Sequence, residues 1–125
     1  IEILLPGMIS KKSGHIIILS SIADELISPE SPSYSASKAG LSVYTESLAL
    51  AVEKKGVAVT NVRFGFVKTK MAKGEKLPFM MSVDKAVGYI VKCIDKKPIR
   101  FSRPVIMAFI VLLVRRVIRF LLLFK

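Results

Sequence analysis

Residues 15–38, HIIILSSIADELISPESPSYSASK, decide the fold. The run HIIIL is short, β-branched and apolar, and turn residues bound it. This pattern is typical of a strand buried on both faces in a parallel sheet. Acidic residues and prolines within residues 24–32 then indicate an irregular loop. A helix is predicted to start near Ser33 or Tyr34.

The helix that begins there runs to about Lys55, and Gly56 supplies its stop signal. Apolar side chains recur along it every three or four residues and predict its buried stripe, which is Leu41, Tyr44, Leu48, Ala51 and Val52. A second face has small side chains and suggests contact with a partner helix: Ala36, Gly40, Val43 and Ser47. Residues 57–62 (VAVTNV) then predict a second buried strand. Strand, helix and strand in this order indicate an α/β fold with a parallel sheet.

The rest of the chain extends this pattern. Residues 1–8 are apolar, but we expect Pro6 and Gly7 to disturb any helix there. Residues 68–81 are basic and Met-rich, and they are predicted to form a loop or short helices after a strand, where α/β proteins bind ligands. Ser82 caps a further helix, and residues 99–102 predict a last short strand. The buried stripe of that helix is predicted to be Ala86, Tyr89, Ile90, Cys93 and Ile94.

Residues 104–125 are predicted to be a unit separate from the α/β domain of residues 1–103. The apolar run 105–114 is too short to span a bilayer, which takes about 20 residues per crossing. On a helical wheel, one side of the segment collects Ala108, Leu112, Arg115, Arg116 and Arg119. The wide apolar arc opposite is typical of a helix in a membrane interface. A helix packed on the domain or on a partner subunit gives the same pattern, so both interpretations stand.

The positive charge of the chain is concentrated in its second half. The whole chain carries a net charge of +11. Residues 1–50 have three Lys or Arg against five Asp or Glu, whereas residues 51–125 have seventeen against four. This gradient suggests an anionic surface as partner, and we expect no nucleic acid, because no reading helix or aromatic platform accompanies the charge. The expected location is cytoplasmic, with the membrane surface as the alternative.

Cys93 is the only cysteine, which excludes an internal disulfide and a zinc site built from several cysteines. We expect no metal, and we expect Cys93 to be a small buried hydrophobe. His15 is predicted to be structural rather than catalytic, because no partner carboxylate lies nearby in the sequence.

Ser21, Tyr34 and Lys38 are the side chains that suggest chemistry. Tyr34 and Lys38 are four residues apart on the predicted helix and therefore share a face. An ammonium beside a phenol favours the phenolate, and such a tyrosine exchanges a proton with a carbonyl or an alcohol near neutral pH. Ser21 lies where the buried strand ends, and its hydroxyl could hold the same substrate oxygen.

Several motifs in order make the chain resemble the short-chain dehydrogenase/reductase family. HIIILSS is followed by YSASK, with Tyr34 thirteen residues after Ser21, and then by VAVTNVRFGFVKT. The resemblance covers about residues 5–103 and implies the C-terminal half of a doubly wound, Rossmann-type parallel-sheet domain. It implies that Tyr34 is the catalytic acid/base, that Lys38 binds the nicotinamide ribose and that Ser21 orients the substrate oxygen. Ser20 is then expected to face the sheet.

The segment FGFVKT, residues 64–69, resembles the PG-x-x-x-T turn of the family, with Phe64 in place of the usual proline. The resemblance implies that this turn binds the cofactor through Gly65, Phe66, Val67 and Thr69. The Val67 backbone and the Thr69 hydroxyl would hold the nicotinamide carboxamide. Residues 68–81 would form the substrate-binding loop.

The motifs of the family's first half, including its Gly-rich turn and catalytic asparagine, do not occur in these residues. We therefore expect a fragment that binds NAD or NADP weakly or not at all and shows no turnover alone. The resemblance implies interconversion of an alcohol and a carbonyl, and a homodimer or tetramer when intact. The apolar C-terminus and the Met-lined loop favour a lipophilic substrate. A non-catalytic membrane-surface or scaffold protein that keeps the fold is the alternative.

Overall fold

The computed structural model describes residues 1–70 and 77–125, so part of the predicted substrate loop lies outside the described residues. In chain order the elements are α1 (Leu5–Ser10), β1 (Gly14–Ser21), the 3-10 turn η1 (Ile22–Glu25), α2 (Pro32–Val52), the 3-10 turn η2 (Glu53–Lys55), β2 (Val57–Phe64), α3 (Val83–Lys96), β3 (Arg100–Arg103) and α4 (Val105–Leu122).

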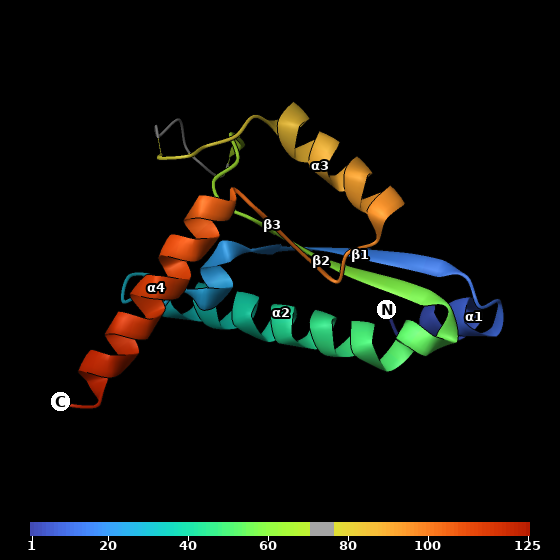
Figure 1. The fold of residues 1–125 in the computed structure, drawn as a ribbon, viewed down its shortest axis with the longest axis horizontal. Coiled ribbons are helices and arrows are strands. Elements are labelled where there is room, and N and C mark those ends of the chain that lie inside the picture. The colour runs from blue at the N-terminus through green and yellow to red at the C-terminus, as the bar shows by residue number, and fades with distance from the viewer. Residues whose placement is uncertain (71–76) are drawn as a thin grey trace.

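Within the described residues the strands form one parallel sheet in the order β1-β2-β3. Helix α2 covers one face of this sheet and α3 lies over the other (Figure 1). Gly56 ends the α2–η2 segment in the left-handed conformation, with a φ of 75°, as the predicted stop signal requires. The predicted α/β fold with a parallel sheet is confirmed.

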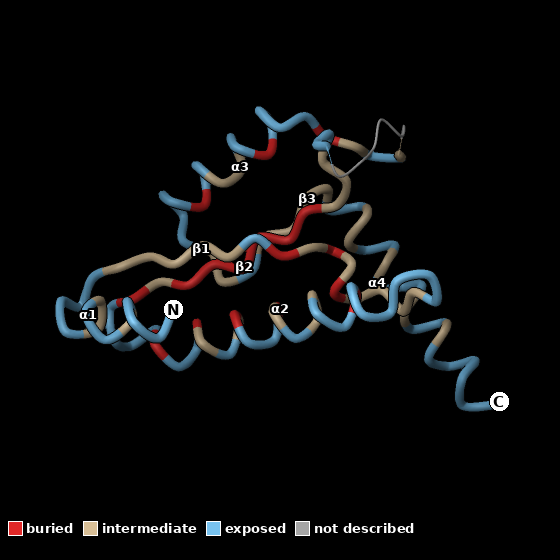
Figure 2. The backbone as a smooth tube through the Cα atoms, turned by 180° about the vertical axis from the view of Figure 1, so that it is seen from behind, coloured by how far each residue is buried: buried red, intermediate tan, exposed pale blue. Residues whose placement is uncertain are grey.

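Strand β2 lies at the centre, and its side chains alternate between two apolar clusters. Val57 and Val59 pack with Ala49 and Val52 beneath α2. Val62 and Phe64 point to the opposite face and pack with Ala86 and Cys93 of α3. The buried trace of β2 between two more exposed layers is visible in Figure 2.

Strand β1 is less buried than its apolar sequence predicts. It pairs with β2 along one edge, and most of its residues are half-buried. Leu19, on the α3 side, is 53% exposed. The prediction of burial on both faces is therefore wrong for this part of β1, because α3 packs over β2 and β3.

Helix α2 begins and ends close to the predicted positions, but it buries a different stripe. Its buried side chains are Ser35, Ser42, Thr45, Ala49 and Val52. Of the predicted stripe, Val52 is buried and Leu41 and Leu48 are half-buried, whereas Tyr44 and Ala51 are exposed. The predicted stripe is therefore correct in part, and it missed the buried hydroxyl side chains.

Hydrogen bonds explain why the hydroxyl groups of Ser42 and Thr45 lie on the buried face of α2. Ser42 Oγ donates to Asp24 Oδ2 at 2.5 Å, and Thr45 Oγ1 donates to the Leu41 carbonyl at 2.7 Å. Burying a polar group costs little free energy when the group makes a hydrogen bond inside the protein. Apolar periodicity does not detect such positions.

Two shorter helices also correct the sequence predictions. Helix α1 forms despite Pro6, which lies in its first turn, where a missing N–H breaks no helical bond. Helix α3 is capped by Ser82, whose Oγ accepts from the Lys85 N–H, as predicted. Ile94, however, is exposed, because it follows buried Cys93 and points about 100° away from it.

Helix α4 packs its first turns against β3 and η1 and then projects away from the sheet (Figure 1). Its inward side chains are half-buried, and none of its residues is fully buried. Among the described residues, no helix is both long and apolar enough to cross a membrane.

Candidate active site

The predicted site residues lie where the carboxyl ends of β1 and β2 meet. Ser21 is the last residue of β1 and pairs in register with Phe64, the last residue of β2. Because both strands run in the same direction, η1 and residues 65–69 start side by side. Parallel α/β sheets bind ligands at this edge.

A cavity of about 500 Å³ lies at this edge, within the size range of small-molecule sites. Six of the predicted site residues line it: Ser21, Tyr34, Gly65, Phe66, Val67 and Thr69. They come from three segments that are separate in sequence, namely the end of β1, the start of α2 and the turn after β2. Of the predicted set, Lys38 alone is not among the lining residues.

Ser21 is held at the cavity by two hydrogen bonds. Its Oγ accepts from the Ala23 N–H at 3.1 Å and so caps η1. The same hydroxyl donates to the Phe64 carbonyl at 3.3 Å. This second bond is long for an O–H donor, so a ligand oxygen can compete for the Ser21 proton.

Ser20 faces the other side of the sheet, as predicted. It is buried, and its Oγ lies 2.9 Å from Ser42 Oγ of α2. Successive side chains of a strand point to opposite faces, so Ser20 and Ser21 cannot serve the same cavity.

Tyr34 and Lys38 occupy the first two turns of α2. Tyr34 is 43% exposed, and it lines the cavity. Lys38 Nζ lies 5.7 Å from the centroid of the Tyr34 ring, within the range of a cation–π contact. The phenol thus borders both the cavity and a positive charge, which suits a group that exchanges protons.

The turn after β2 is fixed by backbone hydrogen bonds. The Lys68 N–H donates to the Met81 carbonyl and the Met81 N–H donates to the Phe66 carbonyl, both at 2.9 Å. The Thr69 N–H donates to the Val67 carbonyl at 2.8 Å. The two bonds to Met81 hold residues 66–68 against the segment just before α3 and keep the turn beside the cavity.

Phe64 and Gly65 join the turn to the core and to α4. Phe64, which stands where the family has proline, is buried and continues β2. A Cβ on Gly65 would lie 2.5 Å from Met107 Sδ, so the glycine lets α4 pack against the turn. Met107 and Val111 of α4 also line the cavity. Neither residue was predicted as part of the site, although their spacing of four places them on one helix face.

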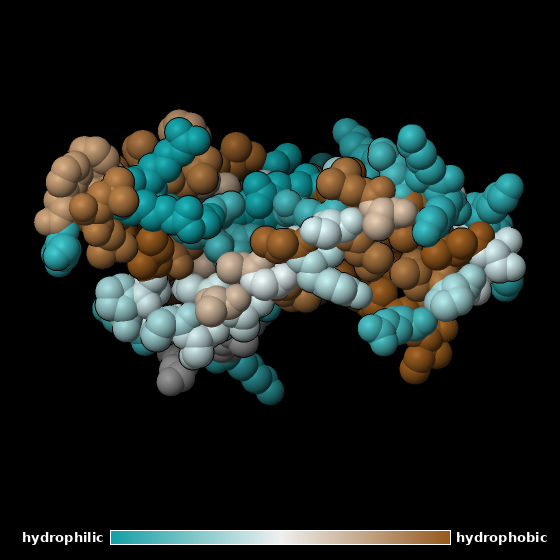
Figure 3. Space-filling view, turned by 90° about the horizontal axis from the view of Figure 1, so that it is seen from below, coloured by the Kyte–Doolittle hydropathy of each residue, from teal (hydrophilic) through white to brown (hydrophobic). Residues whose placement is uncertain are grey.

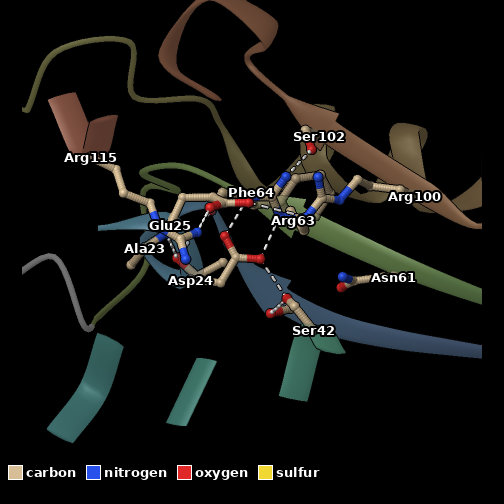
Figure 4. Close-up of polar contacts among 12 residues, drawn as sticks. Ala23, Asp24, Glu25, Ser42, Asn61, Arg63, Phe64, Arg100, Ser102 and Arg115 are labelled. Atoms are coloured by element: carbon tan, nitrogen blue, oxygen red, sulfur yellow. Dashed lines mark hydrogen bonds and ion pairs between the residues drawn. The ribbon is translucent and has the colours of Figure 1, made fainter. Parts of the chain in front are cut away.

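A buried ion pair fixes η1 beside β2 (Figure 4). Arg63 Nε donates to Asp24 Oδ2 at 2.6 Å, and Arg63 Nη2 also contacts Asp24 Oδ1. Both side chains are almost fully buried. Arg63 Nη1 donates in addition to Ser102 Oγ of β3 at 3.1 Å. The pair connects the residues that follow Ser21 to the strand that leads into the cavity turn.

Glu25 connects the same turn to β3 and α4. Arg100 Nη2 lies 3.3 Å from Glu25 Oε1, and Arg100 Nε donates to Glu46 of α2 at 2.8 Å. Arg115 of α4 forms an ion pair with Glu25 (Figure 4). From the sequence, Glu25 indicated only a loop. An arginine inside an apolar strand, such as Arg63, was the signal that a buried acidic partner exists.

His15 and Cys93 lie apart from the cavity lining. His15 Nε2 lies 2.8 Å from Thr60 Oγ1, which supports a structural role. Burial lowers the pKa of His15, and the charge of Lys97 lowers it further. Cys93 is buried, and burial raises the pKa of its thiol against a smaller opposite effect of Arg103. The expectation that Cys93 is a buried hydrophobe is confirmed.

Comparison with known proteins identifies the family. The family model for short chain dehydrogenases matches residues 1–78, which is more than half of the chain. The chain therefore belongs to the short chain dehydrogenase family.

Individual relatives agree with this assignment. An uncharacterized oxidoreductase of Myxococcus xanthus is 36% identical over 102 residues, which cover 80% of this chain and 40% of that protein. A very-long-chain 3-oxoacyl-CoA reductase of Coprinopsis cinerea is 37% identical over 93 residues, which cover 68% of this chain and 27% of that protein. The structure of a short chain dehydrogenase of Burkholderia cenocepacia in complex with NADP superposes with a TM-score of 0.77 at 25% identity. The superposition covers 88% of this chain and 46% of that protein. The chain thus spans less than half the length of each relative, and its fold is of the Rossmann type.

Proposed function

We propose that this chain carries the proton-handling part of an NAD(P)-dependent oxidoreductase that interconverts an alcohol and a carbonyl. One observation carries the proposal: Ser21, Tyr34 and residues 65–69 come from separate segments and line one cavity of about 500 Å³. Membership of the family and the NADP in the Burkholderia structure support a nicotinamide cofactor. The choice between NAD and NADP stays open.

The residues around the cavity fit a nicotinamide group. Phe66 and Val67 offer an apolar wall to a flat ring, and Thr69 offers a hydroxyl beside them. In this proposal the Val67 backbone and the Thr69 hydroxyl hold the carboxamide, while Tyr34 and Lys38 hold the ribose. When bound, the cofactor supplies or accepts the hydride.

The other steps fall to the side chains of this chain. In reduction, Tyr34 gives its hydroxyl proton to the carbonyl oxygen, and in oxidation its phenolate takes the proton from the alcohol. Lys38 stabilises the phenolate by its charge. Ser21 turns its hydroxyl from the Phe64 carbonyl to the substrate oxygen and so fixes that oxygen beside Tyr34.

The cavity wall supports a lipophilic small-molecule substrate. Apart from the site residues, the wall includes large apolar side chains from the residue after η1, from the segment before α3 and from α4: Leu26, Leu77, Met107 and Val111. Such a wall favours an apolar chain or ring system next to the reacting carbonyl.

Helix α2 supports the proposal of a homodimer or tetramer. Its small-residue face is exposed: Ala36, Gly40, Val43 and Ser47. Small side chains allow a second helix to approach closely.

A pair of tyrosine variants tests the proposed function in the protein expressed from its whole reading frame. We expect Tyr34→Phe to lower turnover of a lipophilic carbonyl by about 10²- to 10⁴-fold, because the proton donor is lost. Binding of NADPH, measured by its fluorescence, should persist. Tyr44→Phe is the matched control, since Tyr44 is an exposed residue of the same helix and is not among the cavity lining.

Equal turnover by the two variants would reject the role of Tyr34. NADPH binding by the wild-type protein without turnover of any carbonyl would favour the alternative, a non-catalytic membrane-surface or scaffold protein that keeps the fold.

A further inference from the structure

Helix α4 has an inner face that belongs to the domain. Met107, Val111, Arg115 and Ile118 recur at intervals of four, four and three residues, and all four are half-buried. Met107 and Val111 line the cavity, and Arg115 pairs with Glu25 of η1. The orientation of α4 about its own axis is therefore fixed by the domain.

The opposite face of α4 is apolar and uncovered. We name this face the outer arc; its members are Ile106, Phe109, Leu113, Val117 and Phe120. They recur at intervals of three and four residues, and each is at least 51% exposed. Phe124 extends the arc, since its ring centroid lies 5.1 Å from that of Phe120. Large hydrophobic side chains are also visible at the α4 end of the molecule in Figure 3. A continuous apolar face of this kind marks an interaction surface.

Positive charge borders the outer arc. Arg116 is seven residues after Phe109 and so lies next to it around the helix, and Arg119 follows three residues later along the same side. Both arginines are exposed. Residues 104–125 contain no Asp or Glu, so the segment has no acidic group of its own to neutralise this edge.

We propose that α4 docks on an anionic phospholipid surface, with the outer arc among the acyl chains and Arg116 and Arg119 at the lipid phosphates. An apolar face bordered by arginines has the chemistry of a helix that lies in the membrane interface. A second copy fits this face less well, because pairing two outer arcs would bring the arginines of both copies together without an acidic partner from either segment. The inner face, held by Glu25, keeps the domain attached to the helix.

Docking in this orientation also has a consequence for the cavity. This consequence rests on the proposed function. Met107 and Val111 lie on the inner face of the same helix, so α4 supplies one wall of the cavity and, through its opposite face, the membrane contact. A lipophilic substrate could then pass from the membrane to Tyr34 along α4. The docking itself does not depend on the chain being an enzyme.

Flotation with lipid vesicles tests the docking, with the protein expressed from its whole reading frame. Vesicles of phosphatidylcholine alone are compared with vesicles of phosphatidylcholine and phosphatidylserine. We expect the wild-type protein to float with the anionic vesicles. Phe109→Ser/Phe120→Ser and Arg116→Glu/Arg119→Glu should each lower its partition coefficient by about tenfold or more.

Val87→Ser/Val91→Ser is the matched control, because both valines are exposed apolar residues of α3 and lie outside the outer arc. This variant should float like the wild-type protein, and circular dichroism verifies that all variants are folded. Flotation that both α4 variants retain would overturn the proposal. A second result would also overturn it: the wild-type protein is a dimer that does not float, and Phe109→Ser/Phe120→Ser is a monomer. That result would assign the outer arc to contact with a second copy. Loss of turnover by Tyr34→Phe is measured separately, so failure of the docking and failure of the proposed function can be distinguished.

Discussion

Ser20 and Ser21 have the same side chain and opposite surroundings. Ser20 bonds to Ser42 beneath α2, whereas Ser21 borders the cavity and caps η1. Strand alternation requires that one of them points away, and the resemblance to the family indicates which one. The candidate side chains Ser21, Tyr34 and Lys38 could therefore be selected from the sequence. The bond from Ser21 to the Phe64 carbonyl could not, because the position of Phe64 depends on the pairing of the strands.

His15 provides a residue-scale prediction about pH. Its Nε2 bonds to Thr60, and its buried Nδ1 has no hydrogen-bond partner among the described residues. A protonated ring would bury an unsatisfied N–H, and the pKa of His15 is lowered from its ordinary value of 6.5. Between the folded and unfolded pKa values the unfolded chain binds more protons, so the free energy of unfolding falls as pH drops below about 6.5.

Urea denaturation between about pH 8 and pH 5 measures this effect. We expect the wild-type protein to lose more stability at the acidic end than His15→Gln, whose side chain does not titrate. Parallel curves for the two proteins would contradict the assignment.

Turn η1 is the element that holds the site together. It follows Ser21 directly, and its Asp24 and Glu25 contact side chains of β2, β3 and α4. No local pattern in residues 22–25 predicts this role. Its acidic residues are typical of a solvated loop, and their partners lie about 40 to 90 positions later in the chain.

Breaking the Asp24–Arg63 pair tests this element. Arg63→Met leaves the Asp24 carboxylate buried without its cation, and we expect a loss of about 3 to 5 kcal/mol in the free energy of unfolding. Arg100→Met is the control, because the Arg100 side chain is 46% exposed and its ion pairs should contribute about 1 kcal/mol or less. The double variant Asp24→Leu/Arg63→Met should recover much of the loss. Similar small losses for Arg63→Met and Arg100→Met in urea denaturation would show that the buried pair does not hold η1.

In the helices, sequence patterns predict the ends of the elements better than they predict which side chains are buried. The existence and ends of α2 and α3 could be predicted from caps and breakers such as Ser82 and Gly56. The buried stripe of α2 could not, because Ser42 and Thr45 are buried through hydrogen bonds rather than through apolarity.

At the scale of the molecule, the order strand, helix, strand was enough to predict a parallel α/β sheet. The resemblance to the family then located the turn after β2 beside Ser21 and Tyr34. What could not be predicted is that α4 forms a wall of the cavity. Met107 reaches Gly65 across about 40 residues of sequence, and only the packing of α4 on β3 and η1 creates that contact. The division between residues 1–103 and 104–125 therefore stays a prediction, as do the oligomeric state and the cytoplasmic location.

The most direct test of the proposed site follows the transferred hydride in the protein expressed from its whole reading frame. NADPH that carries deuterium at the transferable position of the nicotinamide ring is offered with a long-chain carbonyl substrate, and the alcohol product is examined by mass spectrometry. We predict that the wild-type protein and Tyr44→Phe deliver deuterium to the carbinol carbon, while Tyr34→Phe delivers about 10²- to 10⁴-fold less in the same time. Deuterium transfer by Tyr34→Phe at the rate of Tyr44→Phe would contradict the account.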